Sequence, residues 1–278
     1  MREGSVRCLD PHGFHRLRWT EWGDPANPRV LVCAHGLTRC GRDFDFLASR
    51  LADEYRVVCP DLPGRGLSDR LADPADYGYP VYCADMATML GALGAERVDW
   101  VGTSMGGILG MLLAAQPRTP VAKLVLNDVG DVVPKAALDR IGTYVGLVPA
   151  FDTLEALEAA MRAVSPFGEL DAAQWRHLAV HAAVRGDDGR WRFRYDPGIA
   201  VPFKAATLGD VDLRPFWNAV RGPALVIRGE TSDLLTPEIL ARMATRPGTE
   251  TLAVPRTGHA PMLMNDAEAG AVRRFLLA

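Results

Sequence analysis

The strongest chemical signal in the sequence is a serine held between two glycines. Ser104 lies between Gly102 and Gly106 in a G-x-S-x-G pattern, after an apolar stretch at 98–102 and before a helix-forming stretch at 105–116. Glycines at these positions let two backbones approach closely at a sharp turn between a strand and a helix. Such a turn exposes the hydroxyl at the carboxyl edge of a sheet, where the new helix directs free N–H groups at a reacting carbonyl. We therefore predict that Ser104 is a nucleophile.

A serine hydroxyl is a weak nucleophile and needs a base within hydrogen-bond reach. Of the six histidines, His259 lies just after the last predicted strand and before the last predicted helix. A loop in that place starts at the carboxyl edge of the sheet and can reach Ser104. His259 is the predicted general base, and the alternative is an ordinary surface-loop histidine.

The base in turn needs a carboxylate that fixes its tautomer. Asp233 follows a predicted strand and precedes His259, which gives the chain order Ser, Asp, His that this arrangement favours. Asp128 has a similar position after the preceding predicted strand, and Glu230 lies closer to a strand end. We predict Asp233 as the acid, with Asp128 as its main competitor.

Two other patterns match known sites incompletely. His177 and His181 stand four residues apart on a predicted helix, but residue 178 is leucine and not the glutamate of the zinc-protease motif. We predict ordinary histidines there and no metal site. Gly64 and Gly66 flank an arginine as in part of a phosphate loop, but no Gly-Lys-Ser/Thr follows, so a tight loop near the rim of the site is expected.

Short apolar stretches alternate with helical ones along most of the chain. The predicted strands span residues 14–22, 30–34, 55–59, 98–102, 122–127, 224–228 and 251–254, with residues 8–13 in or near the turn before the first. The predicted helices span residues 41–51, 82–93, 105–116, 237–244 and 267–277. This alternation, with nearly continuous apolar strands, indicates an α/β fold: a mostly parallel central sheet of about eight strands with helices on both faces.

Residues 133–208 lack the pattern of a buried strand. A capping-box pattern at 152–155 precedes apolar residues at helical spacing, and a second box at Asp171 and Gln174 opens a helix through residue 182. We predict a mainly helical cap over residues 133–208, inserted into a core domain formed by residues 1–132 and 209–278.

Residues 190–195 of the predicted cap alternate arginine and aromatic side chains, which an extended segment would place on opposite faces. The plain interpretation is that the aromatic face packs the cap and the arginines face water. Alternatively, the segment borders a substrate tunnel, where an arginine could pair with a substrate carboxylate. The candidate substrate-binding residues are Trp175, Trp191, Phe193, Arg192 and Arg194.

Composition excludes several classes of partner. The chain has 278 residues with 31 basic and 34 acidic side chains and no basic stripe, which argues against nucleic-acid binding. No apolar run approaches the roughly 20 residues of a membrane span, and the N-terminus does not resemble a signal peptide. Five cysteines without a CxxC pair indicate reduced thiols. We expect a cytoplasmic monomer or small homo-oligomer that acts on a small molecule, with no membrane partner.

The chain resembles the α/β-hydrolase superfamily, in particular its capped bacterial esterases, lactonases and carbon–carbon bond hydrolases. The resemblance rests on His35-Gly36, the segment 61–68 (DLPGRGLS), the serine turn, Asp233 and Gly258-His259. It implies that the backbone N–H groups of Leu37 and Met105 form an oxyanion hole. Related dehalogenases and epoxide hydrolases carry aspartate where this chain has Ser104, which argues against both activities.

The resemblance also implies an activity. We expect a serine hydrolase that cleaves a small or medium carboxylic ester or lactone through an acyl-enzyme, without an organic cofactor or metal. Cleavage of a carbon–carbon bond in a diketone and acyl transfer to another acceptor are the alternatives among enzymes. A ligand receptor that keeps the hydrolase fold is the alternative from another class.

Overall fold

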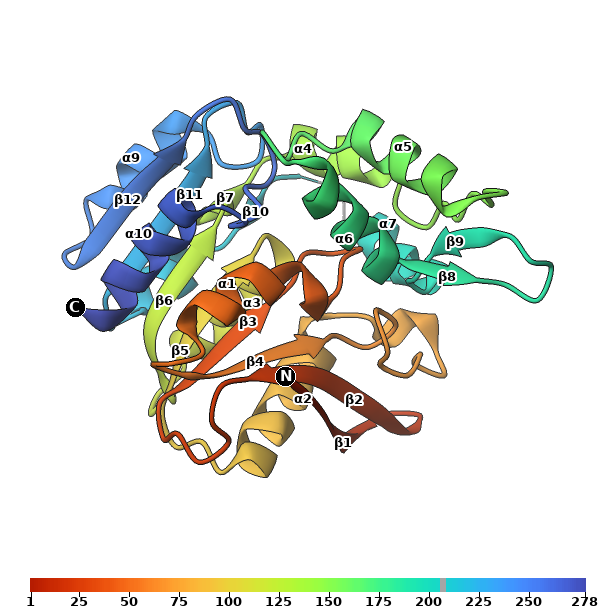
Figure 1. Ribbon diagram of the computed structural model, residues 1–278. Coiled ribbons are helices and arrows are strands. Elements are labelled where there is room, and N and C mark those ends of the chain that lie inside the picture. Colours follow the sequence, from red (N-terminus) through yellow and green to blue (C-terminus); the bar gives the residue numbers. More distant parts are fainter. Residues whose placement is uncertain (206–208) are drawn as a thin grey trace.

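A single twisted sheet forms the centre of the molecule (Figure 1). The computed structural model describes residues 1–205 and 209–278. The eight strands lie in the order β1-β2-β4-β3-β5-β6-β11-β12. β1 and β2 are antiparallel to their neighbours and the remaining strands are parallel, which confirms the predicted fold class. The strands are β1 (Arg2–Asp10), β2 (Gly13–Trp22), β3 (Val30–Ala34), β4 (Arg56–Asp61), β5 (Val98–Thr103), β6 (Val121–Asn127), β11 (Ala224–Gly229) and β12 (Thr249–Val254).

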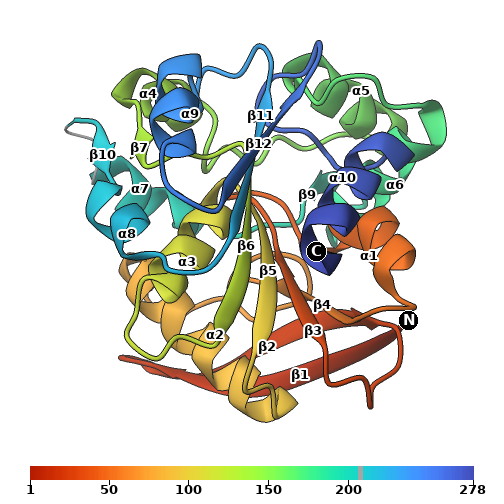
Figure 2. The same ribbon diagram turned by 90° about the vertical axis from the view of Figure 1, so that its left-hand side faces the viewer.

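Helices cover both faces of the sheet, as Figure 2 shows. One face carries α2 (Tyr79–Leu93), α3 (Met105–Ala114), α8 (Arg214–Ala219) and α9 (Pro237–Ala244). The other face carries α1 (Asp45–Leu51), which follows the short helix η1 (Gly41–Phe44), and α10 (Asp266–Leu277). Because β3, β5 and β6 are buried on both faces, their continuous apolar runs are explained.

The N-terminus departs from the prediction. Residues 8–13 lie in or near the turn between β1 and β2, as expected, but no strand was predicted before this turn, where β1 pairs with β2 along its whole length. β1 is an edge strand whose side chains are mostly polar and half-exposed or exposed. Such a strand has no apolar run, so periodicity did not reveal it.

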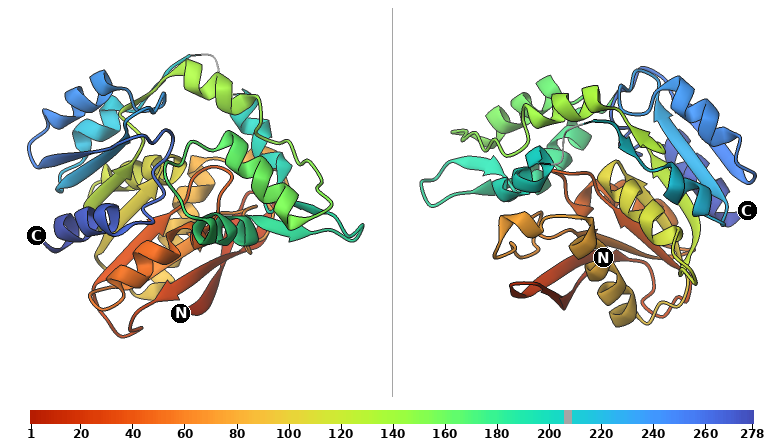
Figure 3. Two further views of the ribbon diagram at one scale, coloured as in Figure 1. Left: turned by 45° about the horizontal axis from the view of Figure 1, so that its top comes forward. Right: turned by 180° about the vertical axis from the view of Figure 1, so that it is seen from behind.

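The segment between β6 and β11 lies over one end of the sheet (Figures 1 and 3). A capping box at Asp171 and Gln174 begins the helix α6, as predicted, whereas α5 is capped by Thr153 and not by residue 152. The predicted cap boundary at residue 208 lies outside the described residues. The described elements of the segment are β7 (Val132–Val133), α4 (Lys135–Gly142), α5 (Leu154–Val164), α6 (Ala172–Ala182), β8 (Ala183–Arg185), β9 (Trp191–Phe193), η3 (Pro197–Ile199), α7 (Ala200–Ala205) and β10 (Val211–Asp212).

α5 and α6 share a small apolar core of their own. Leu157, Met161 and Leu178 are buried there together with Met262 and Met264, which belong to the loop after β12. This packing connects the segment to the loop that carries His259. Within the described residues, no helix combines the length and apolar character needed to cross a membrane.

Candidate active site

Ser104 lies at the tight turn between β5 and α3. Its backbone has φ 52° and ψ −116°, a conformation that is unfavourable for a residue with a side chain. A Cβ atom on Gly102 would lie 2.2 Å from the carbonyl oxygen of Gly106, and one on Gly106 would lie 2.1 Å from that of Ala34. A larger residue at either position would clash with the neighbouring backbone, so the two glycines are what allow this tight turn.

His259 connects Ser104 to a buried carboxylate. Its Nε2 lies 2.9 Å from Ser104 Oγ, and its Nδ1 lies 2.8 Å from Asp128 Oδ2. The Asp128 side chain is fully buried, whereas that of His259 is 13% exposed. When Nδ1–H donates to the carboxylate, Nε2 is left to accept the hydroxyl proton of the serine. The three side chains thus have the geometry that activates a serine.

The prediction that Asp233 orients the histidine is wrong. Among the described residues, Asp128 and not Asp233 contacts His259. The half-exposed Asp233 instead accepts two hydrogen bonds from Arg140 on α4, at 2.6 and 2.8 Å. Partial burial would raise the pKa of Asp233, but the Arg140 guanidinium outweighs it and lowers this pKa.

Asp128 is held by the loop that had been expected to supply the acid. It follows β6 directly, and the backbone N–H of Gly229, at the end of β11, donates to its Oδ1 at 2.8 Å. The Ser232 hydroxyl donates to Oδ2 at 2.7 Å. Because β6 is the sheet neighbour of β5, Asp128 starts one strand closer to Ser104 than Asp233 does.

The two expected oxyanion-hole residues flank the serine. Leu37 and Met105 line the same cavity as Ser104. In the part of the chain that the structure describes, neither backbone N–H donates to a protein acceptor. Both donors are therefore free for a substrate oxygen.

Two buried side chains hold the Leu37 loop. His35 donates through Nδ1 to Gly36 O at 2.7 Å and accepts the Leu62 N–H at Nε2, 3.0 Å away. Burial lowers the pKa of His35 to about 3, which keeps this ring neutral. Arg65, only 1% exposed, donates through Nε to Leu37 O at 2.9 Å. Sequence reasoning treated Arg65 as part of a rim loop, and the only signal for its role was a charged residue between two glycines.

Comparisons with known proteins show the family to which the chain belongs. The Alpha/beta hydrolase family matches residues 31–271. The chain belongs to this family. It is 48% identical, over 99% of its length and 97% of the relative's, to the 3-hydroxybutyrate-oligomer hydrolase of Cupriavidus necator. An alpha/beta hydrolase from Novosphingobium aromaticivorans has 41% identity and a TM-score of 0.88, with 99% of this chain and 98% of that one covered. A solved structure from Rickettsia typhi has 31% identity and a TM-score of 0.94, with 100% and 99% covered.

Two cavities of this alpha/beta hydrolase meet at Ser104. The smaller, of about 270 Å³, is lined almost entirely by apolar and aromatic side chains, among them Tyr79, Ile108 and Val129. The larger, of about 470 Å³, is bordered by His259 and by aromatic residues of the segment between β6 and β11. The serine therefore has space on two sides.

The larger cavity also contains two arginines, each with its own counter-ion. Arg39 donates to Asp43 through Nε at 2.8 Å and Nη2 at 2.7 Å. Arg140 is paired with Asp233. The charge of each guanidinium is therefore balanced within the protein.

The five candidate substrate-binding residues differ in whether they reach a cavity. Phe193 lines the larger cavity, together with the neighbouring Tyr195. Within the described residues, the other four candidates line neither of the two cavities. Trp175 stacks on Phe167 in the small apolar core, and Trp191 packs against that core. Arg192 forms an ion pair with Asp188, and Arg194 donates to the Ala183 carbonyl.

His177 and His181 lie where α6 meets the start of α1. His177 Nε2 donates to the Arg42 carbonyl at 2.9 Å. Burial, and then the nearby Arg42 charge, lowers the pKa of His181 to about 4. Both histidines therefore belong to the contact between the two helices.

Proposed function

We propose that this chain is a serine ester hydrolase that cleaves the ester bonds of short 3-hydroxybutyrate oligomers through an acyl-enzyme on Ser104. The single observation that carries the mechanism is the position of His259, with one ring nitrogen on Ser104 Oγ and the other on Asp128. The substrate rests on full-length similarity to a relative named for that activity.

In the first half of the reaction, Ser104 Oγ attacks the ester carbonyl carbon while its proton moves to His259 Nε2. The carbonyl oxygen takes up negative charge and accepts hydrogen bonds from the Leu37 and Met105 N–H groups. Each donor of this kind stabilises the transition state by roughly 3 kcal/mol. His259 then gives the proton to the departing alcohol oxygen, which leaves an acyl-serine.

In the second half, His259 takes a proton from water, and the hydroxide so formed attacks the acyl-serine carbonyl. The proton returns to Ser104 Oγ and the carboxylic acid leaves. Asp128 stabilises the imidazolium in both halves because its buried carboxylate faces Nδ1. No step requires an organic cofactor or a metal ion.

The cavities support a substrate with groups on both sides of the scissile bond. One cavity takes the acyl unit and the other the alcohol unit, because both reach Ser104. Each esterified 3-hydroxybutyrate unit carries a methyl group and a neutral ester, which suits walls that are apolar or internally charge-balanced, and the single free carboxylate lies at the end of the oligomer. The segment between β6 and β11 acts in this proposal as a cap that covers both cavities.

The test is to incubate the protein with the 3-hydroxybutyrate dimer and trimer and to measure released 3-hydroxybutyrate, with Ser104→Ala as the control. Release by the wild type alone supports the proposal. Turnover of simple butyrate esters without turnover of the oligomers would leave an ester hydrolase with another substrate. Absence of turnover on esters, lactones and diketones alike would favour a ligand receptor.

A further inference from the structure

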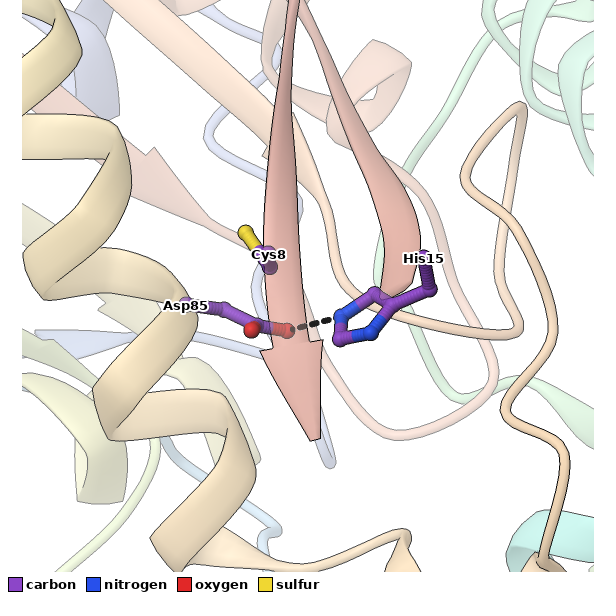
Figure 4. A group of neighbouring side chains, drawn as sticks. All are labelled: Cys8, His15 and Asp85. Atoms are coloured by element: carbon purple, nitrogen blue, oxygen red, sulfur yellow. Dashed lines mark hydrogen bonds and ion pairs between the residues drawn. The ribbon is translucent and has the colours of Figure 1, made fainter. Parts of the chain in front are cut away.

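A second group of polar side chains lies inside the protein, where the hairpin of β1 and β2 meets α2 (Figure 4). Cys8 and His15 face each other across the hairpin. Cys8 and Asp10 point to the same side, because alternate residues of a strand share a face. Asp85 enters from α2. All four residues are exposed by 7% or less, and none of them belongs to the site at Ser104.

His15 lies between two carboxylates. Its Nδ1 is 3.0 Å from Asp10 Oδ2, and its Nε2 is 2.9 Å from Asp85 Oδ2. Asp85 Oδ1 is buried and has no hydrogen-bond partner among the described residues. A buried carboxylate oxygen without a partner is costly. The group thus places an unpartnered acceptor atom close to a thiol and an imidazole ring.

The positions of the ligand atoms suit a small dication. Cys8 Sγ, a ring nitrogen of His15 and a carboxylate oxygen of Asp85 all lie within 4.8 Å of one another. Tetrahedral zinc, with bonds of about 2.0–2.3 Å, separates its ligand atoms by roughly 3.3–3.7 Å, so small side-chain shifts suffice. Thiolate, imidazole and carboxylate are the three ligand types that zinc uses.

Asp10 is placed to hold the His15 ring without itself binding the ion. A histidine that binds zinc through one ring nitrogen usually donates the other N–H to a carboxylate, which fixes the ring and its tautomer. Asp10 has that position at His15 Nδ1, while Nε2 lies 2.9 Å from Asp85 Oδ2.

Two other groups in the described residues are less suited to a metal. Asp45, His177 and His181 lie close together, but Arg42 already forms an ion pair with the Asp45 carboxylate. The group of Asp10, His12 and Asp76 includes the exposed His12 and has no sulfur ligand.

We propose that Cys8 Sγ, His15 Nε2 and Asp85 bind a structural Zn²⁺ ion, with Asp10 as a positioning residue for His15. The unpartnered Asp85 Oδ1 is available as a further ligand atom. As the dication enters, the thiol and the imidazole Nε2 release to solvent any proton that they carry, and both then bind the ion as deprotonated ligands. Because the site is closed, the ion enters as the chain folds and fastens β1, β2 and α2 together. This departs from the expectation of no metal.

The test is to produce the protein in medium supplemented with zinc or with cobalt, purify it without chelators, and measure metal per chain by atomic emission. We expect about one ion per chain, as for a single structural site, and a sulfur-to-cobalt charge-transfer band in the cobalt form. Cys8→Ser should abolish that band. Asp10→Asn should weaken binding about 10- to 100-fold, as loss of such an outer carboxylate does elsewhere.

Cys83→Ser is the matched control, because Cys83 lies on α2 near Asp85 but outside the cluster. It should keep both the metal and the band. His181→Asn should keep them as well, which excludes the group on α6. Wild-type protein that folds in zinc and in cobalt media yet contains neither ion would overturn the proposal. So would metal content that Cys8→Ser leaves unchanged.

Discussion

His259 and His15 each lie between two polar groups, one on either ring nitrogen. His259 has Asp128 at Nδ1 and Ser104 at Nε2, while His15 has Asp10 at Nδ1 and Asp85 at Nε2, with the Cys8 thiol close by. Both sets therefore contain a nucleophilic atom, a histidine and a carboxylate.

Their surroundings differ. Ser104 and His259 border cavities, whereas Cys8 is 2% exposed in the main apolar core. Burial, and then the Asp85 carboxylate, raises the pKa of the Cys8 thiol to about 12, so no thiolate forms at neutral pH without a metal. The same set of residue types thus borders a cavity in one place and is closed in the core in the other, so we expect catalysis at the first and a stabilising role at the second.

The largest loss of activity is expected from substitutions at the accessible site, where Ser104 and His259 border the cavities. Ser104→Ala and His259→Ala should each lower kcat by about 10⁵-fold, because these groups act as a unit. Ester turnover measures the loss, and circular dichroism checks that the fold is intact. If Ser104→Ala kept a tenth of wild-type activity, another residue would be the nucleophile.

The next effect separates the two candidate acids. Asp128→Asn should lower kcat by about 10³- to 10⁴-fold, because an amide at this place favours the wrong histidine tautomer. Asp233→Asn is the matched control and should cost less than about tenfold, since it removes only a half-exposed ion pair. The same ester assay compares them, and a larger loss from Asp233→Asn would contradict the observed pairing.

Asp128 also shows what sequence reasoning could and could not reach. Ser104 and His259 were predictable because local context, a strand followed by a turn, places them at the sheet edge. The acid was ambiguous because two aspartates follow neighbouring strands, and strand order alone cannot say which carboxylate faces the ring. Contacts from Gly229 and Ser232, far along the chain, decide it.

The same limit applies to the buried cluster and to the fold. Strands such as β3 and helices such as α9 were predicted with their observed bounds, because their apolar patterns are local. β1 was missed because an edge strand with polar side chains has no such pattern. The contact between His15 and Asp85 joins residues 70 positions apart, so no spacing in the sequence points to it.

The third effect should appear in stability and not in catalysis. His15→Asn removes the ring that joins the buried Asp10 and Asp85, and with it one ligand of the proposed zinc ion. It should lower the free energy of unfolding by about 3 kcal/mol, as loss of one partner in a buried ionic contact does. Chemical denaturation measures this loss, and kcat of the folded protein should stay near the wild-type value. A selective fall in kcat with unchanged stability would show that the two histidine sites are coupled.

The smallest effect is expected at the outer edge of the candidate active site, on β9 and the residue that follows it. Arg192 forms hydrogen bonds with Asp188 at 2.8 and 2.6 Å, and Arg194 donates to the Ala183 carbonyl at 2.9 Å, whereas Phe193 between them lines the larger cavity. Arg192→Met and Arg194→Met should therefore change kcat/KM little, and equally, for a neutral ester and an acidic analogue. Phe193→Ala is the control on the same strand and should lower kcat/KM for both substrates, because it removes an apolar wall. An arginine that bound a substrate carboxylate would instead cost about 1.5–3 kcal/mol, or 10- to 150-fold, on the acidic substrate alone. That selective loss would show that this segment binds the substrate directly and does not only support the cavity wall.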